Sequence, residues 1–400
     1  MNSDHPLWSC GLRPFFLFAG LSAPLLVATW SLFLAVGLPL PAVPGGPFVW
    51  HAHELLFGFA FAAMTGFLLT VVPSFAGGAD FTARPLQGLA VLWLLGRLAF
   101  WTSGWLGTPA VALAGLLHLA LLGGLARLVV PRLWRDPGRG HLAFLWAIGG
   151  FMACVAGFYA DALAGYHPAR WLHATLGIFM MLIILALSRV SMRIVNHAIE
   201  ETGGGGEYLA RPPRRRLAIL TIGLYTAAEC FLPDTPLPGG LALAAALAVF
   251  NLMRDWHVGR ALFHPRVLML YAVYVAMATG YATMGIALIF DTGLFSAGRH
   301  LLTVGALGLA IYAVMGIAGR AHCGQPFEAR RWFPLGAALI AVAALVRALS
   351  AWPGVETTAF LAAAGLLWTT GYGLFAWHMV PLFLRPRADG LHGCKGTAIP

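Results

Sequence analysis

Apolar runs of about 20 residues recur along the whole chain, and each is long enough for an α-helix to cross a bilayer. Only 10% of the 400 residues are charged, against about 25% in soluble domains. We therefore predict an all-α, polytopic membrane protein with a single integral membrane domain and twelve transmembrane helices. The spans are expected near residues 15–37, 51–73, 86–107, 110–130, 141–164, 171–190, 216–232, 239–253, 266–290, 299–318, 334–352 and 357–384.

The basic residues predict the orientation of the helices. A cytoplasmic N-terminus places the arginine-rich segments 127–139 and 189–216 inside, and it leaves only Arg170 and Arg299 facing outward. Cytoplasmic loops of membrane proteins carry such an excess of basic residues. The formal net charge of +10 therefore indicates membrane topology and a lipid bilayer as partner rather than a nucleic acid.

One segment between the apolar runs is long and polar. Residues 196–215 contain Gly203–Gly206, and we predict a flexible cytoplasmic linker between two six-helix halves. The five cysteines are scattered, and the predicted topology places Cys10, Cys323 and Cys394 in the reducing cytoplasm. No disulfide framework is expected there.

Trp50-His51-Ala52-His53-Glu54 opens the second predicted span with two imidazoles and a carboxylate. In an ideal helix His51 and Glu54 share a face, whereas His53 lies about 200° from His51. Either histidine would serve as a metal ligand, and the sequence does not choose between them. Glu54 is a candidate catalytic proton donor, and the alternative is a carboxylate that complements the helix dipole.

Histidines also open the sixth and tenth predicted spans, at His173 and His300. The spacing of four helices indicates a weak internal repeat, with three four-helix arcs in pseudo-three-fold symmetry. Such an arrangement would bring His51 or His53, His173 and His300 to one depth, where imidazoles bind haem iron or copper. Solvated histidines at the membrane interface are the alternative.

Two arginines fall within predicted spans and need anionic partners there. Arg97 lies midway along the third span and Arg347 in the outer half of the eleventh. Haem propionates would suit both, because a guanidinium binds carboxylates in a bidentate manner. Asp161, Glu54 or Glu229 are the alternative partners, and Glu229 is also a minor candidate for a metal ligand.

Several segments resemble the signature segments of the NnrS family. They are Arg13-Pro14-Phe15-Phe16, Trp50-His51-Ala52-His53-Glu54-Leu55-Leu56-Phe57-Gly58-Phe59, Gly66-Phe67-Leu68-Leu69-Thr70-Val71-Val72-Pro73 and His300-Leu301-Leu302-Thr303-Val304-Gly305-Ala306-Leu307-Gly308. The resemblance covers nearly the whole chain. It implies a bacterial inner-membrane protein that contains haem and copper and acts in nitric oxide metabolism and nitrosative-stress resistance. The twelve-helix plan is also similar, more distantly, to that of the haem-copper oxidases.

The chain departs from the family pattern at positions linked to a metal. Tyr271 and Tyr274 stand where family members often have a histidine, and Ile317 stands at an arginine position. His322 and Gly324 of the neighbouring His-x-Gly pattern remain. Tyr271 and His322 are therefore minor metal candidates, and a copper site at these positions is in doubt.

The residues and the resemblance together predict haem b held near the periplasmic side, with nitric oxide bound or reduced at its iron. The activity would be that of an oxidoreductase, with electrons from a quinol or a periplasmic donor. A non-catalytic haem or copper module that senses or buffers nitric oxide is one alternative. A twelve-span secondary transporter is another. Its usual signs are inverted repeats and helices broken at the midplane, whereas the polar groups here lie at helix openings on one side.

Overall fold

Long helices dominate the fold, because a bilayer offers no hydrogen-bond partner to a backbone that is not helical. The structure is a computed structural model that describes residues 4–76, 78–135, 141–326 and 330–394, and these contain no strand. The basic-loop residues 136–139 lie outside the described residues. The α-helices are α1 (Leu12–Val36), α2 (Gly46–His53), α3 (Phe61–Ala76), α4 (Ala83–Trp101), α5 (Ser103–Leu106), α6 (Thr108–Arg135), α7 (Ala143–Leu163), α8 (Ala169–Glu201), α9 (Pro212–Phe231), α10 (Leu237–Met253), α11 (Pro265–Phe290), α12 (Phe295–His300), α13 (Leu309–His322), α14 (Trp332–Leu349) and α15 (Thr357–Leu384).

Ten helical segments of the described residues are long and apolar enough to cross a membrane, which confirms an all-α, multi-pass membrane protein. The predicted count of twelve is not reached, because α4 and α9 fall outside this set. Helix α4 carries Arg84 and Arg97, and α9 begins with Arg214, Arg215 and Arg216. These arginines lower the hydropathy of helices that otherwise have nearly the length of a span.

Two helices contain a stretch of π-helix immediately after a histidine. The π-helix η2 (Glu54–Ala60) joins α2 to α3, and η5 (Leu301–Gly308) joins α12 to α13. His53 precedes the first and His300 the second. Stretches of π-helix are rare and occur frequently at functional sites, so His53 and His300 both remain candidate site residues.

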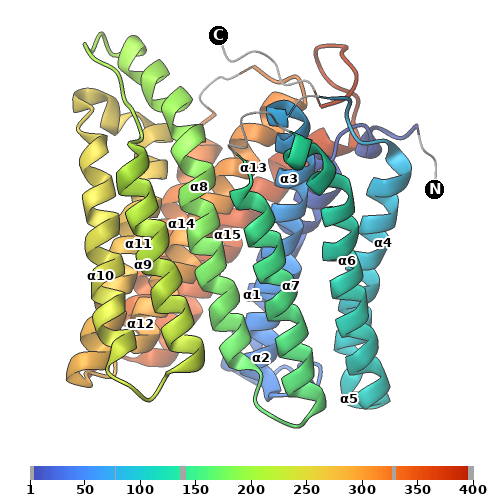
Figure 1. Cartoon of the computed structure of the whole chain (residues 1–400), viewed down its shortest axis with the longest axis vertical. Helices are drawn as coiled ribbons and strands as arrows, with labels where there is room; N and C mark the ends of the chain where they lie inside the picture. The colour runs from blue at the N-terminus through green and yellow to red at the C-terminus, as the bar shows by residue number, and fades with distance from the viewer. Residues whose placement is uncertain (1–3, 77, 136–140, 327–329, 395–400) are drawn as a thin grey trace. The chain divides into compact units, whose positions relative to one another are not determined.

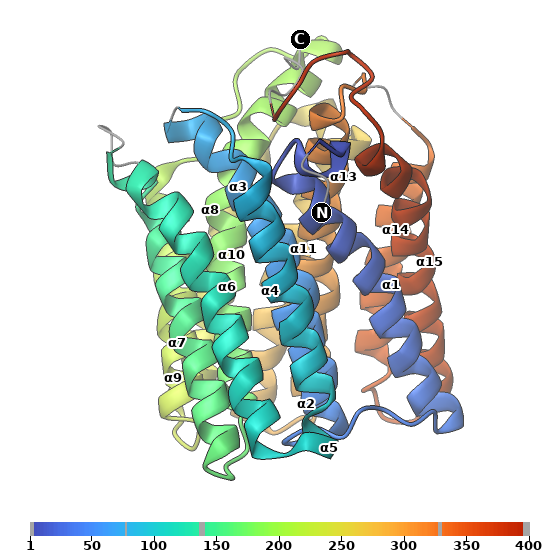
Figure 2. The same ribbon diagram turned by 90° about the vertical axis from the view of Figure 1, so that its right-hand side faces the viewer.

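The chain divides into two compact units. Unit 1 comprises residues 1–175, 314–330 and 372–400, and unit 2 comprises residues 176–313 and 331–371. Within unit 1, α6 packs against α4 and α7 (Figure 2), and α1 packs against α3. Within unit 2, α10 packs against both α9 and α11 (Figure 1). The predicted three-arc repeat concerns both units and stays a prediction.

The segment predicted as a flexible linker is shorter and better anchored than expected. Helix α8 continues to Glu201, and α9 begins at Pro212. Between them, the backbone N–H of Tyr208 donates to Asn196 Oδ1 at 2.7 Å, and Asn196 Nδ2 donates to the Tyr208 carbonyl at 3.2 Å. The Tyr208 ring is buried, and this burial raises the pKa of its hydroxyl to about 12.

The two ends of unit 1 are joined, contrary to the expectation that no disulfide forms. Cys10 and Cys394 form a disulfide across a sequence separation of 384. The physical reason is the buried Arg13, whose Nη1 donates to the carbonyls of Pro6 at 3.1 Å and Arg385 at 2.7 Å. One guanidinium thus holds the N-terminal and C-terminal segments together, which the spacing of the cysteines alone does not indicate.

Candidate functional site

His53 and Glu54 lie at the junction of α2 and the π-helix η2. His53 Nδ1 donates to Glu54 Oε1 at 2.9 Å, so the prediction that His53 points away from Glu54 is wrong. The prediction assumed an ideal α-helix, whereas the wider turn of a π-helix begins at Glu54 itself. The ring of His51 instead stacks on Trp30, with 4.4 Å between the ring centroids.

Arg97 of α4 is the partner of Glu54. Its Nη1 donates to Glu54 Oε1 at 3.1 Å, and both side chains are buried. Of the partners considered from the sequence, the structure thus places the carboxylate of Glu54 beside Arg97. Gly58 permits this approach, because a Cβ at that position would lie 2.9 Å from Arg97 Nη1. Asp161 pairs with Arg170 instead, at 2.9 Å.

His118 of α6 and Tyr159 of α7 extend these contacts. The carbonyl of Ala114 can only accept, and it lies 2.6 Å from His118 Nδ1, so this nitrogen carries the proton. The same Nδ1–H reaches the Tyr159 oxygen at 3.0 Å. The Tyr159 hydroxyl then donates to His53 Nε2 at 2.9 Å.

These five side chains, Arg97, Glu54, His53, Tyr159 and His118, form one hydrogen-bonded chain that we call the buried network. Each is less than a tenth exposed. The ring of Phe100 stacks on His53 with 3.5 Å between centroids and closes one side. Among the described residues, His118 Nε2 and the Nε and Nη2 of Arg97 have no hydrogen-bond partner. The network therefore holds ionisable groups away from water and retains donor and acceptor capacity.

Sequence reasoning missed two members of the buried network. His118 stood out only as a histidine inside a predicted span, and no role followed from that position. Tyr159 gave no signal, because a tyrosine within an apolar helix is ordinary. The contact between them joins residues 41 positions apart, and it exists only because α6 packs on α7.

His300 belongs to unit 2, whereas His51, His53 and His173 belong to unit 1. The Nδ1–H of His300 donates to the Ser296 carbonyl at 2.7 Å, which leaves the lone pair of the neutral ring on Nε2. Arg347 of α14 contacts the same serine, and its Nη2 donates to Ser296 Oγ at 3.2 Å. The side chain of His300 is half-buried.

The other predicted site residues make contacts of their own within each unit. Glu229 pairs with Arg299 within unit 2. The ring of Tyr271 lies 5.8 Å from Trp256, and the half-buried His173 lies in α8. His322, at the end of α13, donates from Nδ1 to the carbonyl of Cys394 at 2.5 Å.

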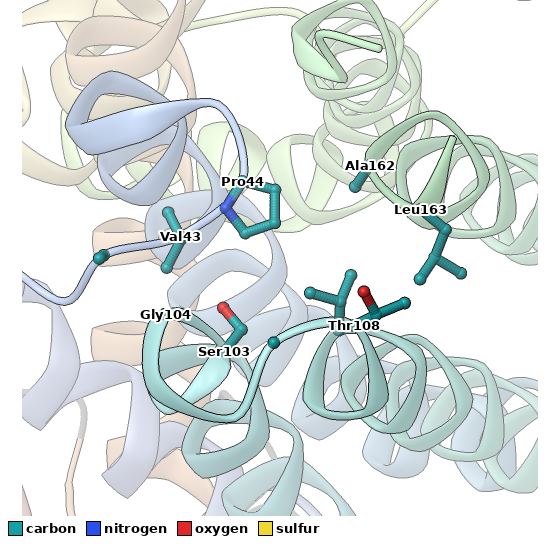
Figure 3. A pocket seen from close by; sticks show the side chains of 10 residues that line it. Val43, Pro44, Ser103, Gly104, Thr108, Ala162 and Leu163 are labelled. Carbon is teal, nitrogen blue, oxygen red and sulfur yellow. The ribbon is translucent and has the colours of Figure 1, made fainter. Parts of the chain in front are cut away.

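A cavity of about 260 Å³ lies in unit 1 between the loop before α2, the connection from α4 to α6, and the end of α7 (Figure 3). Its wall includes Ser103, whose hydroxyl donates to the carbonyl of Phe100 at 2.7 Å. Ala162 also lines it, one turn of α7 beyond Tyr159. The cavity thus lies one helical turn from two residues that form or cover the buried network.

One known protein family matches nearly the whole chain. The sequence profile of the family described as NnrS protein matches residues 6–387. The chain belongs to the NnrS family. The resemblance seen in the sequence is thereby confirmed, and the NnrS match includes the buried network and His300. No match is found among curated proteins.

Proposed function

We propose that this NnrS-family membrane protein binds haem b and binds or reduces nitric oxide, and so protects a bacterium against nitrosative stress. We place it in the inner membrane with both termini in the cytoplasm. Family membership supports the link to nitric oxide. The observation that carries the chemical part is the buried network, because ionisable groups inside a membrane are costly and are usually functional.

The described side chains fit a haem. A metal-ligating histidine usually donates its second N–H to a carbonyl, which fixes the ring and leaves the other nitrogen for the metal. The Nδ1–H of His300 donates to the Ser296 carbonyl, and Arg347 beside it would bind a propionate. His118 has the same arrangement with Ala114. His53 fits less well as a ligand, because both of its nitrogens are hydrogen-bonded.

Haem iron, when bound, supplies a centre at which nitric oxide coordinates and accepts electrons. Conversion of two nitric oxide molecules to nitrous oxide and water consumes two electrons and two protons. A quinol or a periplasmic donor would supply the electrons. The cavity beside Ser103 and Ala162 would give a small uncharged ligand an approach to unit 1. The NnrS resemblance also implies copper, for which imidazole is a suitable ligand.

The buried network would hold and move protons. When His53 Nδ1–H passes its proton to Glu54 Oε1, His53 Nε2 takes the proton of the Tyr159 hydroxyl and the Tyr159 oxygen takes the Nδ1 proton of His118. His118 Nε2 would then take up one proton from water, so every group except Glu54 ends neutral as it began. Arg97 stabilises the negative charge of Glu54 before this carboxylate takes up the proton. The chain of bonds thus connects a carboxylate in η2 with an imidazole in α6.

The visible spectrum of the purified protein, reduced and then exposed to nitric oxide, tests haem binding. We expect a Soret band that shifts with nitric oxide and is lost in His300→Ala. The matched control is His257→Ala, because His257 is exposed and also bonds a nearby carbonyl through Nδ1. A haem-free wild-type protein would overturn the proposal and favour transport.

Anaerobic consumption of nitric oxide with a quinol separates an enzyme from a binding protein. General acid–base groups typically contribute at least about 100-fold, so Glu54→Gln should slow turnover by that factor while haem content stays unchanged. The exposed Glu356→Gln is the control. A wild-type protein that binds nitric oxide without consuming it would be a sensor or buffer.

A further inference from the structure

Two cysteines and a histidine of unit 1 lie close together. The Sγ atoms of Cys10 and Cys394 and a ring nitrogen of His322 all lie within 4.8 Å of one another. Cys10 precedes α1, His322 ends α13, and Cys394 follows the polar tail after α15. Three separate segments thus deliver soft donor atoms to one point.

The imidazole in this group is oriented as a metal ligand would be. His322 Nδ1 lies 2.5 Å from the Cys394 carbonyl, which can only accept. The proton is therefore on Nδ1 and the lone pair is on Nε2. Outer hydrogen bonds of this kind fix the ring and tautomer of metal-binding histidines.

The surrounding groups hold the two cysteine-bearing segments in place. The N–H of Cys394 donates to Asp80 Oδ2 at 2.6 Å. Arg387 Nη1 donates to the carbonyls of His322 at 3.3 Å and Gly393 at 3.1 Å. These bonds do not involve the sulfur atoms, so they persist when the disulfide opens.

The charge at this place favours an anionic complex. Arg13 and Arg387 are both buried here, and Arg13 Nε and Nη2 have no hydrogen-bond partner among the described residues. Two thiolates around a monovalent cation carry a net negative charge, and around a divalent cation they are neutral. Arg387 is paired with Asp389, so the charge left to offset is that of Arg13. The anionic Cu(I) complex offsets it, whereas the divalent complex, like the disulfide, is neutral.

We propose that Cys10, Cys394 and His322 form a binding site for a thiophilic d10 cation, Cu(I) or Zn(II), when the disulfide is reduced. A thiol reductant supplies two electrons and two protons, the S–S bond breaks, and two thiols form. The cation displaces both protons and binds two sulfurs and one nitrogen. Thiolate ligands select Cu(I) and Zn(II), and a three-donor set suits Cu(I), because structural zinc usually takes four ligands.

The site is separate from the proposed haem function. Cys10 lies at the start of α1, whereas the buried network follows the loop after the other end of that helix. The predicted orientation places the cysteines in the cytoplasm, where thiols are kept reduced. Haem content, read from the Soret band of the same samples, therefore reports on the other proposal independently.

The experiment compares reduced and oxidised full-length protein in detergent without oxygen. Each sample is loaded with Cu(I) or Zn(II) alone and washed against a chromophoric chelator, and the retained metal is counted. We expect one additional equivalent in the reduced protein, and the cation retained against the stronger competition identifies the preferred metal. The oxidised protein should lack this equivalent.

Variants assign the ligands. Cys10→Ser and Cys394→Ser should each abolish the additional equivalent. His322→Ala should weaken its binding at least about tenfold, because loss of even a residue that only hydrogen-bonds to a ligand typically costs that much. Cys323→Ser is the matched control, because Cys323 is buried at the same end and is not part of the donor group. Its metal retention should equal that of the wild type.

Two results would overturn the site. One is equal metal retention by the reduced wild type and both serine variants. The other is a disulfide that stays intact in the folded protein under strong thiol reductant. Because Cys394 lies in the tail, Cys394→Ser gives a folded test even if Cys10→Ser does not fold.

Discussion

Arg97 is the residue on which the buried network depends most. Its guanidinium is 9% exposed and the carboxylate of Glu54 is 1% exposed, so neither charge is solvated. Arg97→Met would leave Glu54 charged and buried, and removal of one partner of a buried pair costs about 3–5 kcal/mol. We expect this loss in the free energy of unfolding, measured by denaturation in detergent.

The matched control for this prediction lies in the same unit. Arg170 bonds Asp161, but its side chain is 48% exposed. Exposed pairs contribute at most about 1 kcal/mol, so Arg170→Met should destabilise little. Equal effects of the two substitutions would show that Glu54 is neutral or that water reaches the network.

Asp389 makes the C-terminal tail sensitive to acid. Arg387 donates to both of its carboxylate oxygens and lowers the pKa of Asp389 to about 2. The unfolded value is about 3.9, so this contribution to stability is present above that pH and is lost as the pH falls towards 2. The protection of the backbone at 385–394 from hydrogen exchange, relative to the intrinsic exchange rate at each pH, should fall over this interval.

The comparison variant for the tail is Asp389→Asn, which keeps the shape and removes the charge. In this variant the protection from exchange should already be lower than in the wild type at pH 5. It should also change less between pH 4 and 2. If the variant responds to acid as the wild type does, the acid sensitivity comes from Asp80 instead, the other carboxylate that binds this tail.

Part of the candidate site could be read from single residues. Glu54 and Arg97 stood out because charged groups inside apolar runs need partners, and their pairing was one of the alternatives. The membership of His118 and Tyr159 could not be read, because it depends on the distance between two helices. The predicted direction of the His53 side chain was wrong, because it assumed an α-helix where a π-helix begins at Glu54.

At the scale of the elements, the two π-helices are the least expected feature. Both begin directly after a histidine, and each has a glycine five residues after that histidine, Gly58 and Gly305. Neighbouring side chains fill the space in front of both glycines. Apolar periodicity does not distinguish a π-helix from an α-helix over seven or eight residues, so the sequence predicted only continuous spans.

The packing of α6 on α7 depends on a glycine. A Cβ on Gly115 would lie 2.8 Å from Cγ of Tyr159, so Gly115→Ala should displace the tyrosine. Overpacking of this kind costs about 1–3 kcal/mol. We expect lower stability in detergent and a weakened bond between Tyr159 and His53, visible as altered histidine resonances.

Gly123→Ala on the same helix is the control. Nothing lies within 4 Å of a Cβ at that position, and alanine favours a helix over glycine by up to about 1 kcal/mol. Gly123→Ala should therefore be neutral or slightly stabilising. A similar loss in both variants would mean that α6 is sensitive to backbone rigidity rather than to the Tyr159 contact.

At the scale of the whole molecule, the arginine distribution predicts the orientation. A periplasmic reporter enzyme fused after residue 394 should be inactive, whereas one inserted in the loop at 164–168 should be active, because basic loops stay in the cytoplasm. The reverse pattern would place Cys10 and Cys394 in an oxidising compartment and favour the permanent disulfide.

The fold class followed from the whole sequence more readily than the number of spans. Repeated apolar runs of about 20 residues indicate helices, because a helix of that length crosses the bilayer with its backbone hydrogen bonds satisfied. The number was less certain, because α4 and α9 combine nearly spanning length with several arginines. Whether such a helix crosses the bilayer depends on what its arginines contact. Arg97 of α4, for example, is paired with Glu54 of η2.

The link between Cys10 and Cys394 gives the polypeptide the topology of a closed loop. A single proteolytic cut, for example at residues 202–211, would open this loop without dividing it, and the two pieces would separate on a gel only after reduction. A cation held by both sulfurs would close the loop in the same way. In either state, residues 10–394 would unfold as a loop whose two ends stay together.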